Sequence, residues 1–300
     1  RYYVQTNSCP TCGIHLQYVE EKNDSSENNE IALQAAIATL DAGKIVAVKG
    51  IGGFLILADA TNANTINLLR ARKQRPSKPF ALLYPDLKSL AADVKLSPQA
   101  VKALQSPVAP IVILPVQALP QSGVQVADVA PGLRRLGVML PYAPLLELIS
   151  AALGRPLVAT SGNLSHTPIA YTNEQALERL SGIADGILLH NREIVVPQDD
   201  SVLVFTLRRQ QKIVIRRSRG LAPTLLLPHF QAQNGLLAMG ALLKSTFAFT
   251  HQQNLYLSQY LGDLEDFDTQ QNYQLTLQHL LSTLQVEPTC ILVDLHPAYA

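Results

Sequence analysis

The sequence predicts an α/β (α+β) fold, in which a twisted mixed sheet is covered by helices. Between residues 30 and 226, amphipathic helical stretches alternate with short stretches that are almost continuously apolar. Continuously apolar strands are typical of sheets buried on both faces, and their alternation with helices is typical of α/β proteins. With 300 residues, 47 % of them apolar, the chain is long enough for two units with separate cores.

Apolar spacing and end signals predict five helices. Gly43 and Gly154 each follow a helical pattern and supply the glycine that often ends a helix, and Asn173 is the expected N-cap of the fourth helix. The predicted helices cover 31–43, 65–73, 142–154, 173–182 and 266–285.

Apolar runs bounded by glycine or proline predict the strands. Those of the first unit cover 44–50, 54–60, 79–84, 109–115, 136–140 and 156–163, followed by a hairpin of 201–207 and 212–220. After a proline-framed boundary at 223–235, strand pairs with glycine turns are expected over 236–250 and 254–264. The last strand, 290–295, is expected to be buried.

Two cysteines near the N-terminus, Cys9 and Cys12, enclose a Pro-Thr pair in the way that a zinc knuckle does. A structural zinc site needs four ligands, so residues 1–22 are predicted to be the remnant of a zinc finger. Two ordinary thiols are the alternative, and a thioredoxin-like redox pair is less well supported because no strand precedes the motif. The Ser- and Asn-rich stretch 23–29 is predicted to be a linker.

Charge and hydropathy exclude several classes of protein. Lys and Arg number 24 against 23 Asp and Glu, a net charge of +1, which argues against a protein that coats nucleic acid. No apolar run approaches the roughly 18 residues of a membrane span, and the N-terminus lacks the apolar centre of a signal peptide. Three cysteines do not form a disulfide framework and fit a reducing compartment. We therefore expect a cytoplasmic protein.

Residues 70–79, which we call the basic arm, concentrate positive charge in this nearly neutral chain. Its five cations are Arg70, Arg72, Lys73, Arg75 and Lys78. The dipole of a helix end explains one or two of them, and Arg70 is expected to face solvent. Prolines at 76 and 79 stiffen the chain beyond the helix, so the later cations should project from a defined loop. A rigid group of cations suits a polyphosphate.

Three further stretches carry polar or charged side chains at predicted strand ends. TSGN (160–163) ends a predicted strand at a glycine turn, and its hydroxyls and amide can hydrogen-bond a nucleotide, although such turns are common. QDDS (198–201) pairs two carboxylates, which can cap a turn or bind a divalent cation. RRSRG (216–220) is a second basic cluster at a strand end. Two basic clusters together with TSGN indicate a polyanion site more strongly than any one of them.

Longer motifs make the chain similar to the HypF family, the carbamoyltransferases of [NiFe]-hydrogenase maturation. The resemblance covers essentially the whole chain, from CPTCG at the N-terminus to DLHPAY at 294–299. The intervening motifs are KGIGGF (49–54), ADATN (58–62), LRARKQRPSKPFA (69–81), SPVAPIVIL (106–114), APGLRRLGVMLPYAPL (130–145), LVATSGNLS (157–165), ADGILLHNREIV (184–195), DDSV (199–202), RRSRG (216–220), GALLKSTF (240–247) and LSQYLGDL (257–264).

The resemblance implies two enzymatic units. Residues 30–226 would be a YrdC-like domain that joins a carbamoyl unit, derived from carbamoyl phosphate, to ATP and releases pyrophosphate. Residues 227–300 would begin a TsaD-like domain of the actin/hexokinase (ASKHA) type. That domain would transfer the carbamoyl group to the C-terminal cysteine of the partner HypE, where it becomes the precursor of a cyanide ligand. Mg²⁺ would accompany ATP, and zinc would be held by Cys9, Cys12 and cysteines outside this segment.

The resemblance also implies which residues serve the site. Lys73 and Arg75 would be catalytic, as the cations that offset the developing charge on phosphate. The YrdC-like nucleotide and phosphate contacts would be Lys49, Lys73, Arg75, Lys78, Thr160, Ser161, Asn163, Ser201, Arg216 and Arg217. In the second unit, Gly240 and Lys244 would belong to a further nucleotide site.

The sequence departs from the family pattern at several positions, most of them polar-to-apolar changes. They are Leu55, Pro197, Val204, Leu221, Leu242, Ser245 and Tyr260. A degenerate YrdC-type protein therefore stays an alternative, as does a threonylcarbamoyl-AMP synthase-like enzyme of tRNA modification. RNA binding is a third alternative, against which stand the net charge and an aromatic content of 6 % without Trp.

Overall fold

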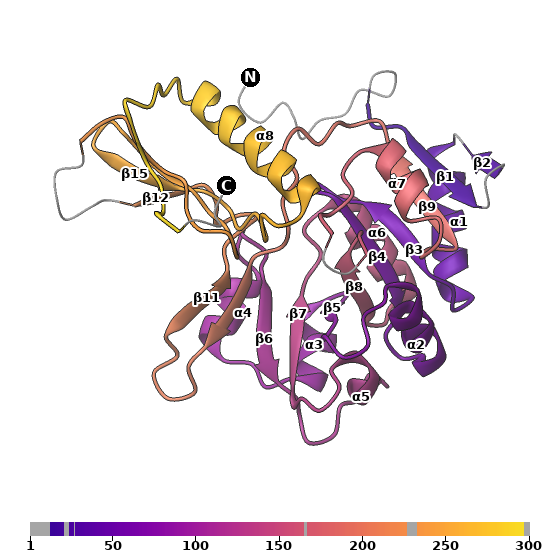
Figure 1. Ribbon diagram of the computed structural model, residues 1–300. Coiled ribbons are helices and arrows are strands. Elements are labelled where there is room, and N and C mark those ends of the chain that lie inside the picture. The colour runs from indigo at the N-terminus through magenta and orange to yellow at the C-terminus, as the bar shows by residue number, and fades with distance from the viewer. Residues whose placement is uncertain (1–12, 21–23, 27, 165–166, 227–232, 297–300) are drawn as a thin grey trace.

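The structure, a computed structural model (Figure 1), describes residues 13–20, 24–26, 28–164, 167–226 and 233–296. The described residues up to 216 contain one mixed sheet of eleven strands, in the order β11-β10-β6-β7-β5-β8-β4-β3-β9-β1-β2. The strands are β1 (Leu16–Glu20), β2 (Asp24–Ser26), β3 (Val46–Lys49), β4 (Phe54–Asp59), β5 (Ala81–Leu83), β6 (Ile111–Pro115), β7 (Arg135–Met139), β8 (Leu157–Ser161), β9 (Gly186–His190), β10 (Val202–Phe205) and β11 (Lys212–Arg216).

Helices cover both faces of this sheet, as the continuously apolar strands require. On one face, the core residues of the strands pack with apolar residues of α2 (Ala63–Arg72), α3 (Leu87–Asp93), α4 (Pro98–Leu104), α5 (Val126–Val129) and α7 (Asn173–Arg179). On the other face they pack with α1 (Asn29–Asp41) and α6 (Pro144–Leu153). Successive residues of β4 alternate between the two cores, so a side chain on this strand faces one core or the other.

A second, smaller unit follows. Its sheet has the strand order β12-β15-β14-β13-β16, and one long helix, α8 (Phe267–Thr283), packs on it through Tyr273 (Figure 1). The strands are β12 (Thr224–Leu226), β13 (Leu236–Ala238), β14 (Ala248–His251), β15 (Asn254–Leu257) and β16 (Cys290–Leu292). Phe247 and Phe249 form the centre of its core, and their aromatic rings lie 6.4 Å apart between centroids. Within the described part of the chain, no helix is long and apolar enough to cross a membrane.

The expected helices and the late hairpin are confirmed, whereas three local expectations are wrong. Thr172, not Asn173, is the N-cap of α7, because its hydroxyl accepts from the Gln175 N–H in a capping box. Residues 24–26, expected in a linker, pair with β1 as the edge strand β2. The final strand is exposed: Ile291 and Leu292 expose 59 % and 51 % of their surface, since β16 is an edge strand paired only with β13.

The two units meet through a small set of polar contacts. The buried amide of Gln259 accepts a hydrogen bond from the Gln198 amide at 2.7 Å and donates one to the Pro197 carbonyl at 2.7 Å. The backbone N–H of Tyr260 donates to the Arg217 carbonyl at 2.6 Å. At the other end of the interface, Arg179 of α7 and Asp268 of α8 form an ion pair at 2.8 Å.

The two sheets should differ in local stability. Strands β3 and β4 are buried in the middle of the large sheet, whereas β16 is an exposed edge. Because buried strands open only with large parts of the fold, we expect amide hydrogen exchange to be slowest in 46–49 and 54–59 and much faster in 290–292. Equal protection of the two regions, measured by mass spectrometry on the 300-residue chain, would contradict this.

Candidate phosphate-binding site

The basic arm begins in the last turn of α2 and leaves the helix after Arg72. Lys73 is the C-cap of this helix, and Gln74 has a positive φ of 52°, which turns the chain out of the helical path. The Arg75 N–H returns to the Arg70 carbonyl at 3.0 Å. The two X-Pro peptides that follow give the arm the defined loop that the sequence predicts.

Lys73 points from this helix end into the protein and is 1 % exposed. Its ammonium donates to the carbonyls of Ser161 and Asn163 at 2.7 and 2.5 Å, and to the Asn163 side-chain oxygen at 3.1 Å. Burial, followed by the charge of Arg75, lowers the pKa of Lys73 to about 7. Lys73, which was expected to project from the loop, is thus buried, and it joins the basic arm to the TSGN turn by direct hydrogen bonds.

Arg75 contacts the same turn from the exposed side. One guanidinium nitrogen donates to the Thr160 hydroxyl at 3.4 Å, and others donate to the carbonyls of Lys78 and Pro79. Burial, and then the charges of Arg70 and Arg216, lower the pKa of Arg75 to about 10. Lys78 is more exposed than Arg75. Even so, partial burial of its ammonium, followed by the charges of Arg75 and Arg216, lowers the pKa of Lys78 as well. These cations repel one another, and a bound anion would relieve the repulsion.

The TSGN turn lies where β8 ends beside β4. The Gly162 N–H donates to the Phe54 carbonyl at 2.6 Å, and a Cβ at Gly162 would lie 2.6 Å from the Phe54 Cβ, so only glycine allows this close approach. The Ser161 hydroxyl donates to the Asn163 side-chain oxygen at 2.7 Å. Glycine therefore brings the polar groups of the turn next to the basic arm.

One carboxylate, Asp199, stands opposite the cations. It forms an ion pair with Arg216 at 2.8 Å, and its charge raises the pKa values of Lys73, Arg75 and Lys78 against the dominant lowering by burial. Sequence reasoning noted the Asp pair but gave it no place in the site. The sequence feature that could have placed the Asp pair in the site is its position directly before Ser201 and a predicted strand.

Asp200 and Arg219 form a buried scaffold beneath this ion pair. Their side chains are each 8 % exposed and are paired at 2.8 Å, and the Arg219 guanidinium lies 3.6 Å from the centroid of the Tyr142 ring. Arg219 also donates to the carbonyls of Val108 and Ala109, which belong to the SPVAP motif. The third arginine of RRSRG, which sequence reasoning passed over, thus binds distant motifs together.

Three residues that were predicted to contact the nucleotide make hydrogen bonds to protein groups outside the basic arm and the TSGN turn. Lys49 donates to the Asn173 side chain at 2.7 Å and the His190 carbonyl at 3.1 Å, and burial lowers its pKa. The Ser201 hydroxyl donates to the Arg219 carbonyl and accepts from the Ser218 N–H, both at 2.9 Å. Arg217 donates to the Thr224 hydroxyl at 2.6 Å. The nucleotide contacts expected of Lys49, Ser201 and Arg217 remain predictions.

The expectation that Arg70 faces solvent is wrong. Its side chain is buried rather than facing solvent, since the residue is 7 % exposed and its guanidinium donates only to backbone carbonyls of the described residues. Sequence periodicity placed it on the outer face of a helix end. The arm folds back over that face, so Arg70 lies beneath it.

The predicted second-unit residues Gly240 and Lys244 lie in the turn between β13 and β14, both with positive φ. The Lys244 N–H donates to the Asp263 carboxylate at 2.7 Å, and the charge of Asp263 also acts on Lys78 of the basic arm. Cys9 and Cys12 lie outside the described residues. Within those residues, no group of three or more His, Cys, Asp or Glu could hold a metal ion.

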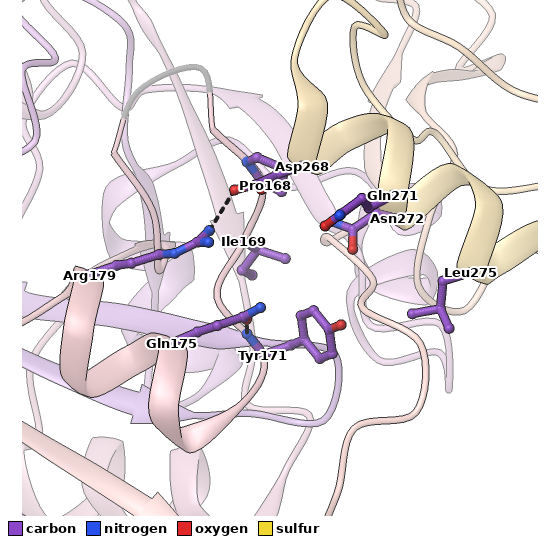
Figure 2. Close-up of a pocket in the computed structure, with 9 residues that line it drawn as sticks. All are labelled: Pro168, Ile169, Tyr171, Gln175, Arg179, Asp268, Gln271, Asn272 and Leu275. Atoms are coloured by element: carbon purple, nitrogen blue, oxygen red, sulfur yellow. Dashed lines mark hydrogen bonds and ion pairs between the residues drawn. The ribbon is translucent and has the colours of Figure 1, made fainter.

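A separate cavity of 260 Å³ lies between α7 and α8 (Figure 2). It contains none of the predicted site residues, and the Arg179–Asp268 ion pair crosses one side of it. Its lining is Pro168, Ile169, Tyr171, Gln175, Arg179, Asp268, Gln271, Asn272 and Leu275. The cavity belongs to the interface of the two units, whereas the candidate site consists of Lys73, Arg75 and Lys78 of the basic arm together with the TSGN turn.

Two family models match the chain. The Sua5/YciO/YrdC model, described as telomere recombination, matches residues 38–218, and the HypF Kae1-like domain model matches residues 231–300. The carbamoyltransferase HypF of Synechocystis is 42 % identical over 274 residues, which are 91 % of this chain and 35 % of that protein. A threonylcarbamoyl-AMP synthase of Stenotrophomonas maltophilia is 32 % identical over 53 % of this chain and 86 % of its own length.

A solved structure matches over the full chain. Full-length HypF in a phosphate- and nucleotide-bound form has a TM-score of 0.89 and 35 % identity, with coverage of 100 % of this chain and 38 % of that one. The chain therefore spans less than two-fifths of the length of the HypF proteins that it matches. The expected mixed sheet and the start of a second, Kae1-like domain are confirmed.

The buried Lys73 predicts a pH dependence of ATP binding. A bound polyphosphate should raise the lowered pKa of Lys73, because an adjacent anion favours the ammonium form. At pH 8 binding should then take up protons, to at most about one per ATP, and affinity should fall as the pH rises above about 7. Calorimetry in buffers of different ionisation enthalpy measures the uptake. Lys73→Arg, which stays charged, should abolish it, and equal uptake in both proteins would contradict the assignment.

Proposed function

The chain belongs to the HypF carbamoyltransferase family, and we propose that its YrdC-like unit forms carbamoyl-AMP from ATP and a carbamoyl unit derived from carbamoyl phosphate. Hydrolysis of carbamoyl phosphate, in which water adds to the phosphorus and the bond between phosphorus and the carbamoyl oxygen breaks, would give carbamate and phosphate. A carbamate oxygen would then form a bond with the α-phosphorus of ATP, while the bond to the β-phosphate breaks and pyrophosphate leaves. This reaction needs reactants in line and cations near the leaving charge more than covalent help.

The single observation that carries the proposal is the cluster of mutually repelling cations beside the TSGN turn. Burial lowers the pKa of both Arg75 and Lys78; the charge of Arg70 lowers that of Arg75 further, the charge of Arg75 lowers that of Lys78, and the charge of Arg216 lowers both. A triphosphate would neutralise this charge, with Arg75 as the bidentate donor and Lys73 as a buried point charge. The Thr160 hydroxyl and the Asn163 amide would then orient the nucleotide.

The roles of the two units and the identity of the acceptor protein are inferred from the family to which the chain belongs. Residues 30–226 would form the adenylate, and residues 227–300 would begin the unit that passes the carbamoyl group to the C-terminal cysteine of HypE, with Gly240 and Lys244 near its nucleotide. Mg²⁺ would enter with ATP as part of the substrate. Zinc at Cys9 and Cys12, and a cytoplasmic location, remain predictions of the sequence.

Threonylcarbamoyl-AMP synthesis is the second candidate, because a synthase of that kind matches 53 % of the chain. It would use the same phosphate cluster with threonine and bicarbonate as the other substrates. The whole-chain match to HypF, including the Kae1-like segment after residue 230, favours carbamoyl phosphate. The two candidates differ in the compound that should trigger turnover of ATP.

The test is isotope exchange between ATP and pyrophosphate. We expect exchange that requires carbamoyl phosphate and that threonine with bicarbonate does not replace. Exchange that depends on threonine with bicarbonate and not on carbamoyl phosphate would favour the synthase, and no exchange under either condition would favour a degenerate YrdC-type protein that binds without turnover.

Arg75 should be required for that reaction. Arg75→Ala removes a charge-assisted and potentially bidentate contact, and should weaken ATP binding by about 1.5–3 kcal/mol, roughly 10- to 150-fold. Arg75→Lys should also be impaired, because an ammonium cannot reproduce the guanidinium fork. The matched control is Arg208→Ala, in the exposed tip of the β10–β11 hairpin. Equal ATP affinities of Arg75→Ala and Arg208→Ala, with folding checked by circular dichroism, would place the nucleotide elsewhere.

A further inference from the structure

Arg70 makes an unusual set of contacts beneath the basic arm. It is 7 % exposed, and all five of its hydrogen bonds go to backbone carbonyl oxygens. Three of them, at 2.6–3.0 Å, hold the carbonyls of Asp128 and Val129 at α5. The other two hold the carbonyls of Arg75 and Lys78, at 2.9 and 3.1 Å. One guanidinium thus joins α2, α5 and the loop that carries the predicted phosphate ligands.

The carbonyls of Arg75 and Lys78 each belong to a peptide bond that lacks an N–H group, because each precedes a proline. The peptides Arg75-Pro76 and Lys78-Pro79 have a carbonyl acceptor but no N–H donor. A glycine-rich phosphate loop binds with its N–H groups, but these two peptides cannot. A carbonyl of this loop turned toward a phosphate would instead repel it. The loop therefore needs its carbonyl oxygens held on the side away from the anion.

Arg70 also holds positive charge close to the site. Its guanidinium carbon lies 4.4 Å from the centroid of the Phe80 ring, and that of Arg75 lies 5.0 Å from the same centroid. Among the described residues, no carboxylate lies within ion-pair distance of Arg70. Its charge acts directly on Arg75, whose pKa burial and then Arg70 lower. Carbonyl dipoles stabilise the Arg70 charge without cancelling it.

We propose that Arg70 is a positioning residue of the phosphate site: it holds the carbonyl oxygen of Arg75 and, together with the Arg75 guanidinium, that of Lys78, so that these oxygens are kept from turning toward a polyphosphate and the cations of the loop face it. The proposal rests on the proposed function, because it assigns Arg70 a role in binding the same ligand. Arg70 itself would not touch the ligand. Its loss should let the two carbonyls turn outward and should weaken phosphate binding more than it weakens the fold.

The variants are Arg70→Met and Arg70→Lys, with Arg72→Met as the matched control. Arg72 lies two residues further along the same helix, where it pairs with Asp185 at 2.8 Å and the Ile183 carbonyl at 3.0 Å, and has no described contact with the loop. Affinities for inorganic pyrophosphate and for ATP are measured by calorimetry on the 300-residue chain, and melting temperatures are measured in parallel.

We expect Arg70→Met to weaken both ligands by about tenfold or more, and Arg70→Lys by a smaller factor, because an ammonium can bind fewer carbonyls in one plane. Arg72→Met should lower the melting temperature but leave both affinities within about twofold of wild type. Guanidinium ion at millimolar concentration should restore part of the affinity of Arg70→Met, whereas ammonium should not. A residue that acts only on stability would show no such rescue.

Several results would overturn the role of Arg70. They are an unchanged affinity of folded Arg70→Met for pyrophosphate, or an equal loss of affinity in Arg72→Met. If Arg70→Met does not fold, Arg70→Lys decides, and wild-type affinity in that variant would refute the proposal. Failure of the wild-type chain to bind pyrophosphate or ATP would instead refute the phosphate site itself, and the role of Arg70 with it.

Discussion

The burial of Lys73 is the constraint on which the site depends. An ammonium at 1 % exposure must find acceptors inside the protein or lose its charge. The structure supplies three oxygens, all from Ser161 and Asn163, so the end of α2 and the end of β8 are held in one arrangement. Gly162 lets that turn approach β4, which joins the turn to the centre of the large sheet. The basic loop is therefore anchored by the most buried part of the fold.

The segment that leads to Asp199, the carboxylate opposite the cations, contacts both units. A Cβ at Gly52 would lie 2.4 Å from the Gln198 carbonyl, and the Gln198 N–H donates to the Gly52 carbonyl at 2.8 Å, so the glycine loop after β3 packs closely on the segment that leads to Asp199. The side chain of Gln198 continues to Gln259 of the second unit. The carboxylate that faces the cations is thus positioned by contacts from both units.

Sequence patterns predict those elements of the structure that depend only on residues close together in the chain. Apolar runs predicted the central strands, and the clustered cations with their prolines predicted the basic arm, but not the burial of Lys73 or its hydrogen bonds to the TSGN turn. They did not predict the burial of Arg70, because only the folded-back loop covers it. Thr172 and Gln175 do have the sequence spacing of a capping box, a signal that the assignment of the cap to Asn173 overlooked. The exposure of β16 depends on its place at a sheet edge, which periodicity does not encode.

The departures from the family pattern differ in how near they lie to the site. Leu55 is 4 % exposed and packs in the core between the sheet and helices α1 and α6, whereas Phe54, beside it on β4, packs in the opposite core together with Leu69 of α2. Leu55 therefore faces away from the helix that carries the basic arm. Tyr260 lies closer: its backbone bonds Arg217, and burial and Asp263 raise its pKa against the opposing charge of Arg216. Of these two departures, Tyr260 is the one that lies near the charged residues of the candidate site.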